Sequence, residues 1–460
     1  MEKGQSEMTC ATAPPRRRRK VPFGAKEHYE HPPLTNETLP FAVWDCARAK
    51  KTTHPVYGPV AEWDTSEVTV MNSLFRGMRF VRPPVDANCP DVILGLDISC
   101  WDTSNVRSTR FMFYSCTCGP VDLSRWDVSQ VRTMEAMFSR ANVALVTGLE
   151  HWKTSSLTDT SKMFRSAVGF CQDVTRFDTS GVTTMAGMFH GVELASSFRA
   201  RPVSLARWVT RRVTDMSKMF RYTLISEWDI SKWDTASLRD MSDMLCTAKN
   251  FRSDLSRWRV NEVTDMTRAF KSASSFSSDL SQWSVGRVTS IEETFFRATS
   301  FTCDLSHWDV TSVVDAREAF AFCPLLCDLS RWRLTAVSGR PYVGMMFFAT
   351  EKSLGPVPPV WDVDAGAWTP ESLECHRAHL ASDGVAATIE AHRLAWTRRR
   401  WRALRDLVHV TRPAALHWLE TVAASQYAPT SKRRKTEEKE MAGELDADFA
   451  TLCARRGRCA

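Results

Sequence analysis

Aromatic residues recur through the chain at a nearly constant spacing, and this period constrains the fold more than any other feature. Trp208, Trp233, Trp258 and Trp283 follow one another in steps of 25 residues. A period of this length is typical of repeat architectures, in which stacked units share one continuous core. The aligned positions are Trp63, Trp101, Trp126, Trp152, Phe177, Trp208, Trp233, Trp258, Trp283, Trp308 and Trp332.

Further apolar positions keep the same phase. An aliphatic residue such as Val131 or Val263 lies five positions after the aromatic residue. A phenylalanine commonly lies twelve positions after it, as in Phe138, Phe164, Phe189, Phe220 and Phe270. The last repeat loses this register, and residues 338–342 are predicted to be an insertion before Met346. A single unit cannot bury these side chains, so stacking of neighbouring units is required.

Each unit predicts two short strands and one helical turn. Polar and apolar residues alternate before the tryptophan and again around the following valine, which indicates two strands. Met-x-x-Met-Phe then places apolar groups on one face of a helical turn. Asp215, Asp240 and Asp265 precede that turn and are suitable N-cap residues. The expected fold is an α/β repeat solenoid of the leucine-rich-repeat kind, with about eleven 25-residue coils and helical caps at both ends.

The composition along the chain divides it into six segments. Residues 36–50 are predicted to form a capping helix, with Asn36 as N-cap and with Phe41, Val43 and Trp44 turned inward. Longer steps before Trp101 and Trp208 predict insertions, around residues 82–90 and 196–202. The segments are a disordered basic tail (1–34), the cap and lead-in (35–60), the repeats (61–352), a Pro-rich linker (353–370), a basic helical region (371–427) and a disordered charged tail (428–460).

The repeat resembles a known family. Segments 126–138 (WDVSQVRTMEAMF) and 233–245 (WDTASLRDMSDML), and the lead-in Tyr57 to Val60, are similar to the BspA-like leucine-rich repeats of bacterial surface proteins and mycoplasma lipoproteins. The resemblance covers roughly residues 35–350 and implies a solenoid used for protein or surface recognition, without catalysis. Because no signal peptide or surface anchor is evident, the chain resembles unexported members of protists, algae or large DNA viruses.

The sequence favours a non-enzymatic protein. It contains no Gly-rich phosphate loop, HExxH or Gly-x-Ser-x-Gly motif, and we expect neither cofactor nor metal. No apolar stretch reaches the length of a membrane span. The scattered cysteines indicate reduced thiols and an intracellular location, cytoplasmic or nuclear. A protein partner is expected along the stacked strands, where residues between the anchors vary.

Two structural alternatives remain open at this stage. The aspartates that directly follow the aromatic anchors form a ladder that favours either turns or, less readily, Ca²⁺: Asp64, Asp102, Asp127, Asp178, Asp234 and Asp309. Cys303 and Cys327 occupy equivalent places in adjacent repeats, within disulfide range, although a reduced pair is favoured.

Basic clusters support a second hypothesis for function. They are candidates for nuclear import or phosphate contact, and they predict a nucleic-acid- or chromatin-associated adaptor as the alternative to a protein scaffold. Nucleic acid is therefore a conceivable partner, although a protein is favoured. The residues are Arg16, Arg17, Arg18, Arg19, Lys20, Arg398, Arg399, Arg400, Arg402, Lys432, Arg433, Arg434 and Lys435.

Overall fold

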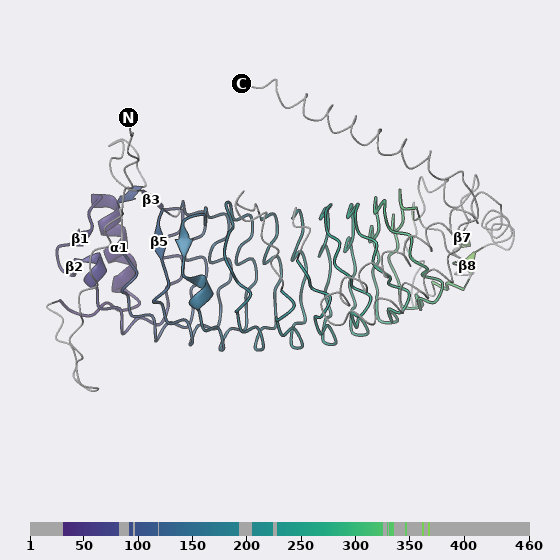
Figure 1. Ribbon diagram of the computed structural model, residues 1–460, viewed down its shortest axis with the longest axis horizontal. Helices are drawn as coiled ribbons and strands as arrows, with labels where there is room; N and C mark the ends of the chain where they lie inside the picture. Colours follow the sequence, from purple (N-terminus) through teal and green to yellow (C-terminus); the bar gives the residue numbers. More distant parts are fainter. Residues whose placement is uncertain are drawn as a thin grey trace, which may run out of the picture. The chain divides into compact units, whose positions relative to one another are not determined.

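A computed structural model describes most of the repeat region (Figure 1). The described residues are 31–81, 92–94, 97–117, 119–192, 205–223, 228–324, 329, 331–334, 346, 361–362 and 367–368. All of them belong to the first of two compact units, Met1–Ser382. The second unit, Asp383–Ala460, lies outside the described residues, as do both expected tails and the expected basic helical region.

Helix α1 (Thr38–Ala49) precedes the first coil. It buries Leu39, Ala42, Val43 and Cys46, whereas Phe41 is 71% exposed and the neighbouring tryptophan, Trp44, is 52% exposed. The expectation that both aromatic side chains turn inward is therefore wrong. The buried residues follow one helical stripe, and the two aromatic residues lie outside that stripe.

Asn36 attaches the cap to the first coil and does not cap the helix. Its side-chain oxygen accepts hydrogen bonds from the backbone N–H groups of Thr69, at 2.8 Å, and Val70, at 3.0 Å. The N-cap position is Glu37, which makes no side-chain capping bond. Strands β1 (Thr53–His54) and β2 (Gly58–Pro59) then pair antiparallel, and the 3₁₀ helix η1 (Val60–Glu62) leads into the first anchor.

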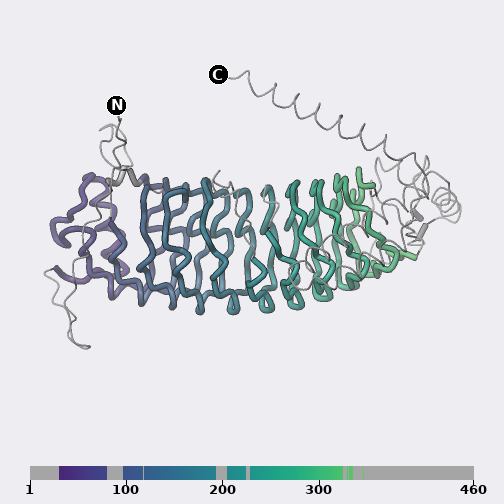
Figure 2. Tube along the Cα trace, in the orientation of Figure 1, coloured from purple at the N-terminus to yellow at the C-terminus, as the bar shows by residue number. Residues whose placement is uncertain are grey.

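The coils are joined by a ladder of parallel bridges. One residue in each coil, seven positions after the aromatic anchor, pairs with its equivalent in the next coil. The ladder runs through Val70, Ser108, Thr133, Asp159, Thr184, Asp215, Asp240, Asp265, Ser290 and Asp315. Figure 2 shows the successive coils side by side in chain order. Each coil thus lies against the next at the spacing of paired strands, about 4.8 Å.

The ladder continues across both predicted insertions. Val70 pairs with Ser108 on the far side of the first, and Thr184 pairs with Asp215 on the far side of the second. The inserted residues themselves, 82–91 and 193–204, lie outside the described residues. The longer steps in the sequence therefore do not interrupt the stacking.

Extended strands are few. Within the coils, strands β3 (Arg79–Val81) and β4 (Val92–Leu94) pair in parallel, as do β5 (Val121–Asp122) and β6 (Val146–Thr147). A 3₁₀ helix, η2 (Leu149–His151), follows β6, and a short pair β7 (Trp361–Asp362) and β8 (Ala367–Trp368) lies beyond the repeats. The expected two strands per coil reduce mainly to isolated bridges in the described coils.

The expected helical turn is also wrong. In ten described coils the segment contains two left-handed residues, ten and fourteen positions after the anchor; Lys162 has φ 56° and Ser166 has φ 52°. Alternate N–H groups bond to the next coil, as Phe138 does to the Met163 carbonyl at 2.9 Å. The remaining N–H groups close local turns. This alternation is incompatible with the i→i−4 bonds of a helix.

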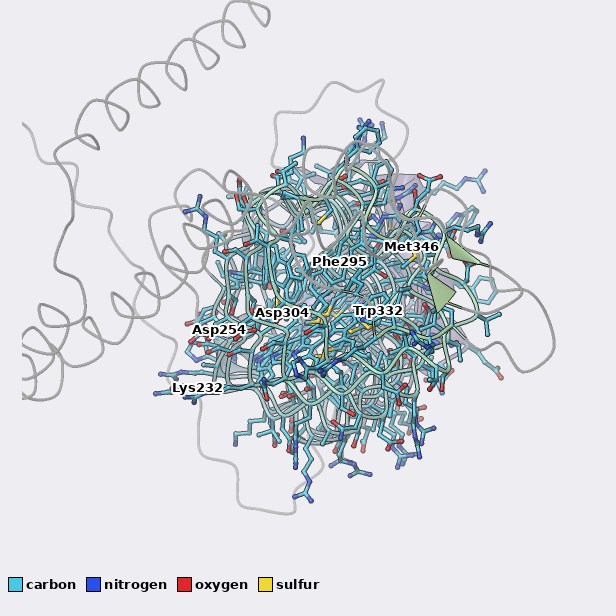
Figure 3. All side chains as sticks on the ribbon, turned by 90° about the vertical axis from the view of Figure 1, so that its right-hand side faces the viewer. Lys232, Asp254, Phe295, Asp304, Trp332 and Met346 are labelled. Carbon is cyan, nitrogen blue, oxygen red and sulfur yellow. The ribbon has the colours of Figure 1, made fainter. Side chains whose placement is uncertain are left out.

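Two aromatic columns form much of the interior. The phenylalanine column stacks ring on ring, with 5.2 Å between the centroids of Phe113 and Phe138 and an interplanar angle of 2°. In the tryptophan column the rings of Trp208 and Trp233 lie 6.0 Å apart at 5°. In Figure 3, Phe295 and Trp332 lie inside the cross-section, whereas Lys232 and Asp254 lie at its edge.

The tryptophans also tie the coils together through their polar atom. The indole N–H of each tryptophan anchor after Trp63 donates to a backbone carbonyl of the preceding coil, for example from Trp233 to Leu205 at 2.9 Å and from Trp308 to Leu280 at 3.0 Å. The acceptor is the aliphatic residue three positions before the preceding anchor. A buried indole donor must be satisfied, so this bond accounts for tryptophan at that position.

The last described coil resumes the pattern after an insertion. In earlier coils the phenylalanine N–H donates to a carbonyl eleven positions after the next anchor, as Phe138 does to Met163, which follows Trp152. Phe320 donates instead to Met346, fourteen positions after Trp332. Met346 thus occupies the place that the residue eleven positions after the anchor holds in earlier coils, and it comes three residues later in the sequence. The predicted loss of register in this repeat is confirmed.

Candidate interaction surface

The repeat anchors predicted from the sequence form the core. Every aromatic anchor from Trp63 to Trp332, and each of the five named phenylalanines, is at most 4% exposed. The tryptophan column is therefore closed to a stacked ligand. The candidate basic residues Arg16 to Lys20, Arg398 to Arg402 and Lys432 to Lys435 all lie outside the described residues, so the structure does not place them.

The aspartate ladder closes turns. A carboxylate oxygen of Asp127 accepts a hydrogen bond from the backbone N–H of Ser129 at 2.9 Å, and Asp178 accepts one from Ser180 at 3.0 Å. Hydrogen bonds from these serines lower the pKa of both carboxyl groups. Asp215, Asp240 and Asp265 accept equivalent bonds at the turn segment. Within the described ranges, no group of three His, Cys, Asp or Glu residues is placed to hold a metal ion.

Cys303 holds the position that Ser278 occupies in the preceding coil and accepts the equivalent hydrogen bond. Its sulfur accepts a hydrogen bond from the backbone N–H of Leu280 at 3.1 Å, just as the Ser278 hydroxyl accepts one from Leu255 at 2.8 Å. Cys327 lies outside the described residues, so the structure does not test a pairing of Cys303 with it.

One partly exposed border of the coils varies strongly in residue type from coil to coil. We call it the turn edge and define it as the residues ten, thirteen and fourteen positions after each anchor. It contains cations, carboxylates, aromatic rings and glycines, and Tyr222 on it is 49% exposed. Several cations lie over aromatic rings: Arg76 over Tyr114, Arg221 over Tyr222, and both Lys271 and Arg297 over Phe296.

The carboxylates of the turn edge lie deeper than its cations. The Asp243 side chain is 3% exposed and lies between Arg221, at 3.3 Å, and Arg268, at 3.4 Å. Those two arginines are 24% and 40% exposed. Glu293 is likewise less exposed than its partner Lys271. Around Asp243 and Glu293 the outermost charges are therefore positive, because each of these two acids is partly covered by the cations that neutralise it.

Cations gather where the carboxylates are missing. Lys162 and Arg165 come from one coil, His190 from the next, and Lys218 and Arg221 from the one after. We call these five residues the basic cluster. The pKa of His190 is lowered to about 4, chiefly by burial and then by Arg165, Arg221 and Lys218, against the opposing effect of Asp243. A neutral histidine at pH 7 therefore lies among four cations.

A second basic row precedes the tryptophans, but acids run beside it. Each member directly precedes an anchor and is exposed: Arg125, Arg176, Arg207, Lys232, Arg257 and Arg331. Aspartates such as Asp229 and Asp254 lie three residues before members of this row, and each accepts a backbone hydrogen bond at its own turn. Figure 3 places Lys232 and Asp254 at the same edge of the cross-section. This row therefore presents both signs of charge.

Sequence reasoning missed the basic cluster. Its three coils contribute residues separated by 25 and 31 positions, from Arg165 to His190 and from His190 to Arg221. The available signal was the period itself, because residues at equal distance from their anchors become neighbours in the stack. Comparing the thirteenth position across repeats would have placed these three residues side by side.

The stacked coils with a shared interior define a tandem-repeat protein. Five overlapping windows match the family described as Mycoplasma protein of unknown function, DUF285: residues 51–146, 88–198, 142–226, 195–301 and 222–332. Together they cover residues 51–332, which is more than half of the chain, and the chain belongs to this family. No curated protein and no solved structure matches it. Within the described residues, no helix is long and apolar enough to span a membrane.

Proposed function

We propose that this protein is a non-enzymatic scaffold that binds a partner protein on a leucine-rich-repeat-type solenoid of the BspA-like kind. The observation that carries the proposal is the contrast between the inside and the outside of each coil. The aromatic and aliphatic anchors are retained in every described coil, whereas the turn edge changes its charge and size from coil to coil. A constant core with a varied surface is what recognition by a repeat protein requires.

The stacking makes that surface large and ordered. A specific protein interface buries about 800 Å² on each partner, and a surface of that size spans several coils. The bridge ladder and the tryptophan bonds hold adjacent coils in fixed register. Arginine and aromatic residues, which dominate interface hot spots, occur together on the turn edge at Arg221 and Tyr222. The turn edge is therefore the favoured contact surface.

The free thiols suit an intracellular member of the family. Cys46 and Cys246 are buried free cysteines, and Cys100 is an exposed one. Free thiols persist in reducing compartments. This supports the proposal that the protein acts inside the cell.

The test is site-specific photocrosslinking with the full-length chain in its native cells. A photoreactive amino acid replaces Tyr222 on the turn edge or, as the matched control, Lys232 on the basic row before the tryptophans. We expect Tyr222 to crosslink to one discrete protein, and the product to survive nuclease treatment. Crosslinking that is equal at both positions, or a product consisting of nucleic acid, would contradict a protein scaffold that acts through the turn edge.

A further inference from the structure

The basic cluster differs from the rest of the turn edge in how its charges are compensated. Lys162 approaches Glu135 at 3.7 Å, and Arg221 approaches Asp243 at 3.3 Å, so each outer cation of the cluster has a carboxylate on its outer side. Within the described part of the chain, Arg165 and Lys218 have no ion-pair partner. The centre of the cluster therefore carries positive charge that this part of the protein leaves uncompensated.

The backbone fixes the spacing of these cations. Ser166 donates to the carbonyl of His190 at 2.6 Å, and Gly191 donates to the carbonyl of Arg221 at 2.7 Å. Arg165, His190 and Arg221 thus follow one another along successive coils at about 4.8 Å per step. Because these backbone hydrogen bonds hold the three residues in fixed positions, their charges are preorganised, and binding an anion costs little conformational entropy.

The middle coil leaves room between the flanking cations. It has glycine at both left-handed positions, Gly187 and Gly191. A Cβ at Gly187 would lie 3.6 Å from Lys162 Cγ, and a Cβ at Gly191 would lie 3.4 Å from Ser166 Oγ. The next coil carries lysine and tyrosine at the same two positions, Lys218 and Tyr222. Only His190 therefore projects from the turn edge of the middle coil.

The guanidinium groups of Arg165 and Arg221 are incompletely hydrogen-bonded within the described residues. The Nε atoms of Arg165 and Arg221 are buried and have no hydrogen-bond partner among the described residues. Burial is the largest cause of the lowered pKa of His190, and the neighbouring cations add to it because they disfavour its protonated form. A dense positive site with a neutral histidine at its centre is complementary to a compact anion of high charge.

We propose that Lys162, Arg165, Lys218 and Arg221, grouped around His190, bind a phosphoryl group presented by a partner protein. The inference rests on the proposed scaffold function and names the chemistry of the partner. A phosphorylated side chain carries a charge of about −1.5 to −2 and three acceptor oxygens. Arginine recognises such a group through paired N–H donors.

The limited extent of the cluster favours a single phosphoryl group over a nucleic-acid strand. Carboxylates flank the cluster in both directions, at Glu135 beside the turn edge on one side and at Asp243, Glu293 and Glu318 on the turn edge on the other. A nucleic-acid strand carries a charge on every nucleotide and is bound along a continuous basic groove. A cluster confined to three coils lacks that continuity.

The experiment measures binding of the full-length chain to a degenerate peptide library with one phosphoserine, phosphothreonine or phosphotyrosine per peptide, and to the same library without phosphate. We expect binding of phosphorylated peptides only. Arg165→Gln and Lys218→Gln should each weaken it roughly ten- to hundredfold, as loss of one charge-assisted hydrogen bond does. Arg257→Gln, an exposed cation outside the cluster, is the matched control and should leave binding unchanged. Melting temperatures of all three variants establish that they are folded.

A second readout does not depend on any variant. Titration of the His190 imidazole by NMR, with and without inorganic phosphate, should show its pKa rising when the anion binds, because a nearby negative charge favours the imidazolium. Equal binding of both libraries, equal effects of Arg257→Gln and Arg165→Gln, or binding of an oligothymidylate in place of phosphopeptides would overturn the inference. If phosphopeptides fail to bind while the Tyr222 crosslink to a protein persists, the inference fails and the scaffold function stands.

Discussion

The rings of Phe270 and Phe295, which hold the same position in successive coils, stack with centroids 5.3 Å apart and an interplanar angle of 6°. Both side chains are fully buried. Since each ring contacts the equivalent ring of a neighbouring coil, removal of one leaves a cavity shared by two coils. Stability in a stacked array depends on nearest-neighbour contacts of this kind.

We therefore predict that Phe270→Ala lowers the free energy of unfolding by about 3–5 kcal/mol and increases hydrogen exchange in the two adjacent coils. Urea denaturation and exchange mass spectrometry measure the two effects. Val314→Ala is the control, since Val314 is 44% exposed and its truncation should change stability by at most about 0.5 kcal/mol. An unchanged melting curve for Phe270→Ala would show that this column does not stabilise the stack.

Asp243→Asn tests the buried ion pairs of the turn edge. The substitution keeps the shape of the side chain and the left-handed backbone, at φ 55°, which asparagine tolerates. It removes the charge that neutralises Arg221 and Arg268. We expect a loss of roughly 3 kcal/mol, because two partly buried cations lose their counter-ion. Asp254→Asn, at an exposed turn, should cost less than about 1 kcal/mol in the same denaturation experiment.

The pKa of His190, lowered to about 4 chiefly by burial, predicts sensitivity to acid. The unfolded chain binds a proton near pH 6.5 and the folded chain does so only near pH 4, so stability rises with pH between these values. Acidification from pH 7 to pH 4 should therefore cost up to about 3 kcal/mol through this residue. His190→Gln should remove that part of the pH dependence. If wild type and His190→Gln lose equal stability over this window, His190 does not carry the effect.

The raised pKa of Asp240 predicts the opposite dependence of stability on pH. Burial raises the pKa of its carboxyl group, and the neighbouring Asp215 and Asp265 raise it further. The folded state thus holds the proton more tightly than the unfolded state, and stability falls as pH rises through the raised pKa. Asp240→Asn should melt above wild type at pH 7, with the difference vanishing near pH 3.

Asp127→Asn is the matched contrast to Asp240→Asn. Hydrogen bonds from Ser129 lower the pKa of Asp127, so its carboxylate contributes stability above the unfolded pKa and loses it as pH falls. The variant should melt below wild type at pH 7. Melting temperatures of both variants across the pH range decide the matter, and shifts of the same sign at pH 7 would contradict the assignment.

Much of the core was predictable because period and burial are linked. Trp258 and Trp283 keep a step of 25 residues because each occupies the same place in its coil, and a buried place accepts few residue types. The local conformation of the turn was not predictable in this way. Met241, Met244 and Leu245 have helical spacing, yet Asp243 between them is left-handed. The next coil takes the N–H groups that a helix would use internally.

Which apolar side chains of the cap are exposed was harder to predict, because the burial of a side chain depends on its place in the fold as well as on its polarity. Phe41 and Trp44 are apolar, and apolarity alone placed them in the cap's interior, whereas the helix buries another stripe. Apolar side chains supply a large share of any protein surface. Their burial depends on the direction in which the helix meets the first coil, a direction fixed in part by the bonds from Asn36 to the next segment.

By itself, the sequence determined that this protein is a repeat array, where each unit begins and which repeat anchors face inward, because a hydrophobic period can be satisfied only by stacking. The tertiary structure decided how the backbone passes through each unit and which charges meet on its surface. Arg165, His190 and Arg221 are distant in the chain and adjacent in space, since backbone bonds between coils bring equal positions together. Their combined field exists only once the coils are stacked, because electrostatic interactions depend on distance in space.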